Sequence, residues 1–268
     1  GFALDDRGTI ATYYHVIEGA KTATVTFLTD KATFPVQGFL VVAPGLVLDY
    51  DAIPGFSLDL VGTNGIGALY SGPEYAAKTW TAAQKFTEEG GIALMTRPAT
   101  EMKCAGAPLK HAFLIEDIAS RSAAAGKFEI HYTAPQAALF GVPIVAEKVR
   151  MLFGTRGIKT HLNHKMLSME PGKKLATFEK TEIDATTKAE VKTTVEMPYD
   201  YLHVIPPQRA PDVIRQSGLS WADKWTDQGW VEVDMKTLRH LRYPEIFALG
   251  DVAGVPKGKT AASVKWMV

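Results

Sequence analysis

One cysteine lies in a sequence context that favours thiol chemistry. Cys104 is the single cysteine among 268 residues, so no disulfide can form within the chain. It follows an apolar run and precedes Pro108, and proline is favoured at the first position of a helix. Free N–H groups at a helix start favour a nearby anion, so a thiolate here would be a competent nucleophile. The alternative is that Cys104 packs as a small apolar residue in a strand-to-helix loop.

Two turns that follow apolar segments are candidate ligand contacts. Gly250-Asp251 comes directly after the apolar residues 246–249. A carboxylate at the carboxyl end of a parallel strand lies where open α/β sheets bind ligands, and it can accept hydrogen bonds from sugar or polyol hydroxyls. Ala43-Pro44-Gly45 forms a turn of the same kind after residues 38–42. An aspartate in this position can also cap a helix, so the Gly-Asp pair alone leaves both interpretations open.

A basic, glycine-containing loop precedes the last predicted helix. Lys259-Thr260-Ala261 lies at the start of that helix, and a helix start stabilises negative charge on a bound group. The loop is not a phosphate-binding loop of the ATPase type, because Ala253 occupies the position where that motif requires glycine.

The overall composition excludes several function classes. Lys plus Arg and Asp plus Glu number 29 each, so the formal net charge is zero and nothing indicates a polybasic nucleic-acid-binding protein. No apolar stretch reaches about 18 residues, and the N-terminus does not have the pattern of a signal peptide. We therefore expect this chain itself to be soluble. His161 and His164 have no third ligand nearby in sequence, which favours a surface pair over a metal site.

The elements that must position these residues alternate between strands and helices. This alternation predicts an α/β fold with parallel sheets, and residues 165–196 are typical of an antiparallel β-meander. Residues 46–75 are predicted to be a loop, and residues 38–42 a strand buried on both faces. The predicted strands are 22–29, 33–37, 38–42, 92–96, 128–132, 158–161, 201–205, 230–233 and 246–249, and the predicted helices are 74–89, 108–126, 145–157 and 259–268.

Taken in order, these motifs resemble those of the sulfide:quinone oxidoreductases, flavoproteins with two dinucleotide-binding domains. The most specific stretch is Lys103-Cys104-Ala105-Gly106-Ala107-Pro108, and the Gly-Asp motif is shared by the wider superfamily. The resemblance covers most of the chain from about residue 38 onward. Its other stretches are residues 40–45, 48–50, 78–80, 202–207, 210–212, 229–234, 242–251, 256 and 259–262.

The resemblance implies FAD as cofactor and a role for each matching residue. Cys104 matches a redox cysteine that forms a persulfide and passes electrons to the flavin. Asp251, with Gly250 beside it, matches the carboxylate that holds the ribityl chain. The remaining matches are Ala43, Pro44 and Gly45 with a second FAD-contacting turn, Pro206 with a segment near the flavin, and Lys259, Thr260 and Ala261 with the helix start that faces the flavin pyrimidine ring. The implied substrates are sulfide and quinone, with no nucleic acid and with peripheral membrane association of the full-length protein.

The sequence also departs from the family pattern. The family has a strand and a Gly-x-Gly-x-x-Gly turn for the FAD pyrophosphate, and a second redox cysteine downstream; this chain shows neither. We therefore expect an internal fragment, inactive by itself, whose first Rossmann-like domain lacks its first strand and glycine-rich turn. The predicted domains are residues 1–74 and 196–268 in an FAD-binding domain, and residues 75–195 in a second dinucleotide-binding-like domain. Residues 97–100 and the cysteine loop replace a glycine-rich turn there, so NAD binding is not expected.

Three alternatives remain open at this point. Two are other flavoproteins: a flavocytochrome-type sulfide dehydrogenase, or an NADH:quinone oxidoreductase, which needs no cysteine. The third is a non-catalytic module that retains the fold without FAD. A flavin absorbance spectrum separates the third from the enzymes, and NADH oxidation without sulfide identifies the second.

Overall fold

The computed structural model describes residues 40–256 and 258–267 in full, and the backbone of four short strands nearer the N-terminus. These strands form two antiparallel pairs: β1 (Phe2–Ala3) with β2 (Ile10–Ala11), and β3 (Thr24–Thr26) with β4 (Thr33–Pro35). The second pair confirms the predicted hairpin between residues 22–29 and 33–37, whose remaining residues lie outside the described ones.

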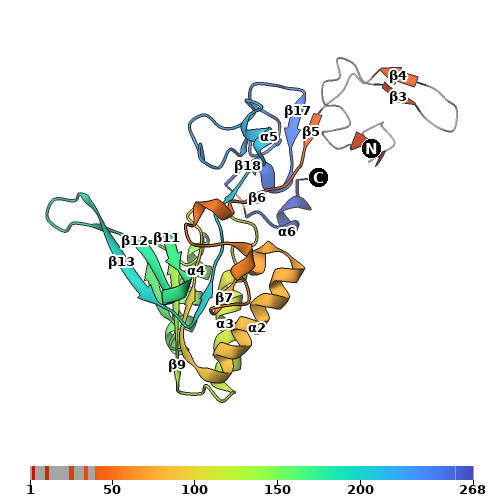
Figure 1. The fold of residues 1–268 in the computed structure, drawn as a ribbon. Coiled ribbons are helices and arrows are strands. Elements are labelled where there is room, and N and C mark those ends of the chain that lie inside the picture. The colour runs from red at the N-terminus through yellow and green to blue at the C-terminus, as the bar shows by residue number, and fades with distance from the viewer. Residues whose placement is uncertain are drawn as a thin grey trace.

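A five-stranded parallel sheet forms the main body of the molecule, which confirms the predicted α/β class (Figure 1). Neighbouring strands follow the order β10-β9-β8-β14-β7, and every pairing is parallel. The strands are β7 (Ile66–Gly67), β8 (Gly91–Met95), β9 (Phe128–Ala134), β10 (Lys159–Leu162) and β14 (Tyr201–His203). Helices α2 (Pro73–Glu89), α3 (Ala107–Ser120) and α4 (Pro143–Thr155) lie between them in sequence.

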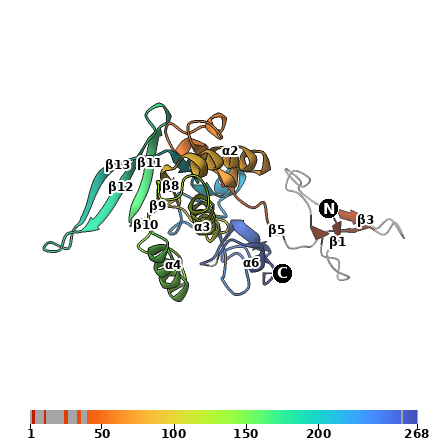
Figure 2. The ribbon, with the colours of Figure 1, turned by 90° about the horizontal axis from the view of Figure 1, so that it is seen from below.

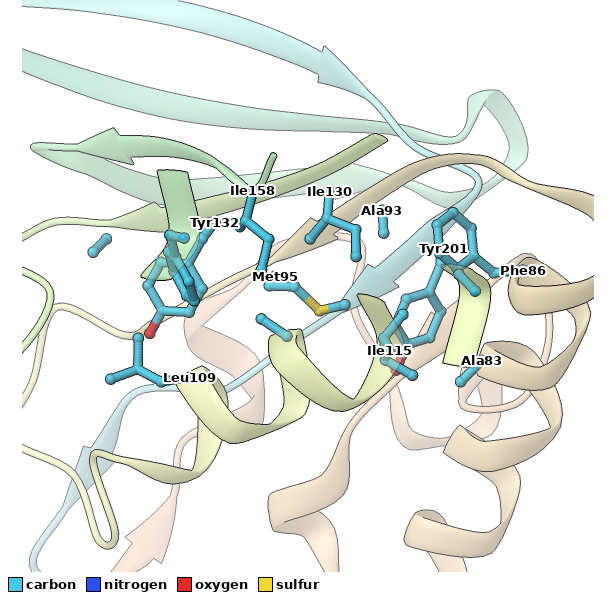
Figure 3. Close-up of a cluster of buried hydrophobic side chains, with 14 of the residues drawn as sticks. Ala83, Phe86, Ala93, Met95, Leu109, Ile115, Ile130, Tyr132, Ile158 and Tyr201 are labelled. Carbon is cyan, nitrogen blue, oxygen red and sulfur yellow. The ribbon is translucent and has the colours of Figure 1, made fainter. Parts of the chain in front are cut away.

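The central strand β8 is apolar throughout because both faces of the sheet are covered there. Ala93 and Met95 point to a core shared with α2 and α3, while Leu94 between them points to the opposite face. Figure 3 shows the first core, where Met95 and Ile130 from the sheet meet Ile115 from α3.

The meander predicted for residues 165–196 is present, and it covers the face of the sheet opposite the helices (Figure 2). It consists of β11 (His164–Glu170), β12 (Leu175–Ile183) and β13 (Glu190–Pro198). Phe178 and Ala176 of β12 pack with Leu94 and Leu202 of the sheet, so the meander closes the second core.

A third core gathers segments from both ends of the described chain. Its strands pair two by two: β5 (Leu40–Val42) with β17 (Ile246–Ala248), β6 (Val47–Leu48) with β15 (Gln208–Arg209), and β16 (Val231–Glu232) with β18 (Ala253–Gly254). The buried Trp230 lies in this core with Val42 and Ala248. The short helices α5 (Asp212–Arg215) and α6 (Ala261–Val264) both lie in the C-terminal region of the chain, among the segments that form this core.

Several predicted elements differ from those observed, among them the helix predicted for residues 259–268, which is only the four-residue α6. The strand at 38–42 was expected to be buried on both faces, but Leu40 is 36% exposed, because β5 pairs with β17 alone among the described strands. The predicted loop 46–75 contains β7, which pairs with β14 and forms one edge of the sheet. The predicted helix 108–126 ends at Ser120, since the chain turns before β9.

Candidate functional site

The two predicted ligand turns lie side by side. They follow β5 and β17, which run parallel with Val42 opposite Ala248. The Leu249 N–H donates to the Val42 carbonyl at 3.0 Å, so Ala43-Pro44-Gly45 and Gly250-Asp251 leave the same edge together. The tertiary structure thus brings together two motifs that are about two hundred residues apart in sequence.

This edge is open and carries an unused carboxylate. Gly45 and Gly250 have φ values of +76° and +72°, in the region that favours glycine. A Cβ added to Gly45 would meet no atom within 4 Å, so the backbone there is accessible to a ligand. Within the described part of the chain, no group hydrogen-bonds to the Asp251 carboxylate, which is half-buried and lies near Lys259 and Thr260.

Cys104 lies in an exposed turn immediately before α3, as the sequence predicted. Its backbone is in the left-handed region, with φ +48°, and is held at both ends. The Cys104 N–H donates to the Lys259 carbonyl at 2.9 Å. The Cys104 carbonyl accepts hydrogen bonds from the Tyr70 hydroxyl and from the Ala107 N–H, each at 2.8 Å.

Two buried glutamines fix the rest of the cysteine loop, residues 100–104. The Lys103 N–H donates to Gln208 Oε1 at 2.8 Å, and the Glu101 N–H donates to Gln228 Oε1 at 2.9 Å. The Gln208 N–H in turn donates to Thr100 Oγ1 at 2.8 Å. The sequence did not indicate the roles of Gln208, Gln228 and Tyr70. These residues lie 34 to 127 positions from the groups they contact, so no local pattern records the contacts.

Lys259 is placed with its side chain in the core. It is 6% exposed, and its Nζ donates to the carbonyls of Asp251 and Ala253 and lies 3.8 Å from the centre of the Trp230 ring. Burial lowers the pKa of the Lys259 ammonium to about 8, while the charges of Asp251 and Glu101 act in the opposite direction.

The remaining predicted residues take different positions. Thr260 caps α6, where its Oγ1 accepts from the Ser263 N–H at 3.1 Å, and Ala261 is the exposed first residue of that helix. Pro206 is buried after β14, two residues before Gln208. Proximity to a ligand therefore remains a prediction for Pro206.

Neither a metal cluster nor a membrane-spanning helix is found where the chain is described. Residues 40–256 and 258–267 contain no group of three His, Cys, Asp or Glu side chains placed to hold a metal ion. His161 pairs with His131, with 2.9 Å between Nε2 and Nδ1, and His164 is buried, so the two residues do not form the predicted surface pair. No helix in the same residues has the length and apolar character needed to cross a bilayer.

Comparison with known proteins identifies the relatives of this chain. No family model matches it. The mitochondrial sulfide:quinone oxidoreductase of Mus musculus is 35% identical over 230 residues, which are 84% of this chain and 47% of that protein. This chain is a homologue of the sulfide:quinone oxidoreductases. The corresponding protein of Dictyostelium discoideum is 33% identical over 226 residues, 84% of this chain and 46% of that protein, so the chain spans about half the length of the curated relatives it matches.

Solved structures show the same fold. The sulfide:quinone oxidoreductase of Aquifex aeolicus aligns with a TM-score of 0.61 and 19% identity, over 87% of this chain and 50% of that chain. A chain of the mitochondrial ATP synthase of Tetrahymena thermophila aligns with a TM-score of 0.64 and 21% identity, over 89% of this chain and 57% of that chain. At such low sequence identities these alignments establish only the fold, and they confirm the predicted Rossmann-like architecture.

Proposed function

We propose that these residues form part of an FAD-dependent sulfide:quinone oxidoreductase in which Cys104 carries the sulfur. The observation that carries the proposal is the hydrogen bond between Cys104 and Lys259, which holds an exposed thiol beside the segment of Asp251. The identity to the mouse and Dictyostelium enzymes supports the same reading. The substrates would then be sulfide and quinone, and the whole protein would associate with the membrane surface to reach its quinone.

The residues at the β5–β17 edge fit the flavin cofactor. The Asp251 carboxylate lacks a hydrogen-bond partner among the described residues, and it can accept from the hydroxyls of a ribityl chain. Gly250 and Gly45 leave room for a ligand to approach the backbone. When bound, FAD would accept two electrons from the thiol pair and pass them on to quinone.

Cys104 would act as one half of a thiol pair. Hydrosulfide attacks a disulfide between Cys104 and a second cysteine of the whole protein; the S–S bond breaks, the new sulfur stays on Cys104 as a persulfide, and the other cysteine leaves as a thiolate. Transfer of the outer sulfur to an acceptor returns the Cys104 thiolate. Re-formation of the disulfide between the two thiolates would then pass two electrons to FAD.

The decisive experiment combines flavin absorbance with sulfide-dependent reduction of a water-soluble quinone. We expect Cys104→Ser to keep the flavin spectrum and to lose at least about 100-fold in rate, since a hydroxyl cannot replace the thiolate nucleophile. Ala105→Ser is the matched control, because it adds a hydroxyl to the same loop and leaves the thiol in place. Asp251→Asn should lower the flavin content.

The outcomes separate this proposal from its alternatives. Full sulfide-dependent activity in Cys104→Ser would refute a sulfur-carrying role, and NADH oxidation without sulfide would favour an NADH:quinone oxidoreductase. Absence of flavin from the purified protein would favour a non-catalytic module.

A further inference from the structure

The side-chain ammonium of Lys259 makes its contacts inside the protein. Its ammonium donates to two backbone carbonyls, those of Asp251 and Ala253, and faces the buried ring of Trp230. An ammonium has three donors and no acceptor, so two carbonyls and a ring face account for all of them. Lys259 is 6% exposed, which leaves almost none of the side chain for contact with a ligand.

The backbone of the same residue holds Cys104. The Lys259 carbonyl accepts the Cys104 N–H at 2.9 Å, and Lys103 and Lys259 form an isolated parallel bridge. Cys104 has φ +48°, a conformation that residues with a Cβ adopt only where the surroundings enforce it. The contact to Lys259 is one of the constraints that enforce it.

We propose that Lys259 is a positioning residue for Cys104: its buried ammonium fixes the backbone whose carbonyl keeps the cysteine in its left-handed conformation beside the Asp251 segment. This role bears on sulfur chemistry only through the proposed function, on which it rests, but its test does not depend on that function. One side chain thus connects the two parts of the site, since its Nζ binds the carbonyl of Asp251 and its own carbonyl binds the N–H of Cys104.

Hydrogen exchange on the whole protein tests the connection. Lys259→Met keeps the apolar stem but removes the donors, so we expect the Cys104 amide to exchange at least about tenfold faster than in the unaltered protein. The amides of β8 should keep their rates. Lys265→Met is the matched control, because Lys265 is exposed in the same C-terminal segment, and it should leave the Cys104 amide unchanged.

Two results would overturn the proposal. One is an unchanged Cys104 amide in Lys259→Met. The other is an equal acceleration in β8, which would mean general destabilisation rather than a specific role.

A measurement on the unaltered protein covers the case in which Lys259→Met does not fold. Acetylation mapped by mass spectrometry should leave Lys259 unmodified while Lys265 and Lys103 react; labelling of Lys259 at the rate of Lys265 would refute its burial. Neither experiment uses sulfide, quinone or flavin. Failure of the proposed function and failure of the positioning role are therefore seen in different measurements.

Discussion

At the scale of single residues, the position of Cys104 is set by its backbone more than by its side chain. Its N–H is held by Lys259, and its carbonyl by Tyr70 and Ala107. A left-handed conformation costs a residue with a Cβ roughly 1–2 kcal/mol, so these hydrogen bonds must offset that cost. The exposed thiol is thus presented by a turn that these hydrogen bonds stabilise.

Tyr70→Phe tests one of these partners. The variant removes the hydroxyl that donates to the Cys104 carbonyl, while the Ala107 N–H still satisfies that carbonyl. We expect the free energy of unfolding in urea to fall by about 0.5–1.5 kcal/mol. Tyr243→Phe is the control. Tyr243 is 41% exposed, and its hydroxyl hydrogen-bonds to no group in the described residues. Loss of this hydroxyl should therefore leave the free energy of unfolding unchanged. Equal stability of both variants would show that Tyr70 does not hold the loop.

At the scale of elements, α3 meets β14 through buried polar groups rather than through apolar contacts alone. His111 Nε2 lies 2.8 Å from the Tyr201 hydroxyl, and the rings of His111 and His203 are 4.5 Å apart. Burial lowers the pKa of His111 to about 4 and places that of His203 well below its usual value, with the His111 charge as a second cause for His203. Both imidazoles are therefore neutral at neutral pH.

This arrangement predicts a loss of stability in mild acid. The folded pKa of His111 lies below the unfolded value of 6.5, so the unfolded chain binds more protons between pH 6.5 and about 4. Stability should fall as the pH falls through this window, and His111 alone accounts for up to about 3 kcal/mol. His111→Gln keeps a polar group near Tyr201 and should reduce the difference between unfolding free energies at about pH 7 and about pH 5.

The control is Lys110→Gln, which changes an exposed neighbour on the same helix and leaves both histidines in place. It should retain the full pH dependence. An unaltered pH dependence in His111→Gln would assign the effect to other groups.

At the scale of the whole molecule, the cysteine loop joins the parallel sheet to the third core. Residues 100–104 come from the connection between β8 and α3, while Gln208, Gln228 and Lys259 come from the last quarter of the chain. Gln228 is the most central of these contacts. Its Oε1 accepts both the Glu101 N–H at 2.9 Å and the indole N–H of Trp230 at 3.0 Å.

Gln228→Leu should weaken this junction. The change leaves the indole N–H of the fully buried Trp230 without an acceptor, and a buried unsatisfied donor costs about 1–3 kcal/mol. We expect the free energy of unfolding in urea to fall by about that amount. Gln216→Leu, at an exposed position after α5, should leave stability within about 0.5 kcal/mol of the unaltered protein. A Gln228→Leu variant as stable as Gln216→Leu would contradict the junction described here.

The sequence by itself determined most of the elements and the class of fold. Apolar runs such as residues 92–96, and the Pro and Gly residues that bound the helices, are local signals, because backbone geometry sets a period of two or 3.6 residues within a short window. The position of Cys104 before α3, and of Asp251 after β17, follows from the same local patterns. Homology to the sulfide:quinone oxidoreductases was visible at this level too.

Only the tertiary structure decided what these residues contact. The pairing of β5 with β17, the entry of β7 into the sheet, and the glutamines that hold the cysteine loop all join segments far apart in the chain. The side chain of Lys259 shows the difference most clearly: its sequence context indicated a ligand contact, whereas packing on Trp230 turned its ammonium into the core. The physical reason is that the direction of a side chain depends on which distant groups can satisfy it once it is buried, and no local pattern records those partners.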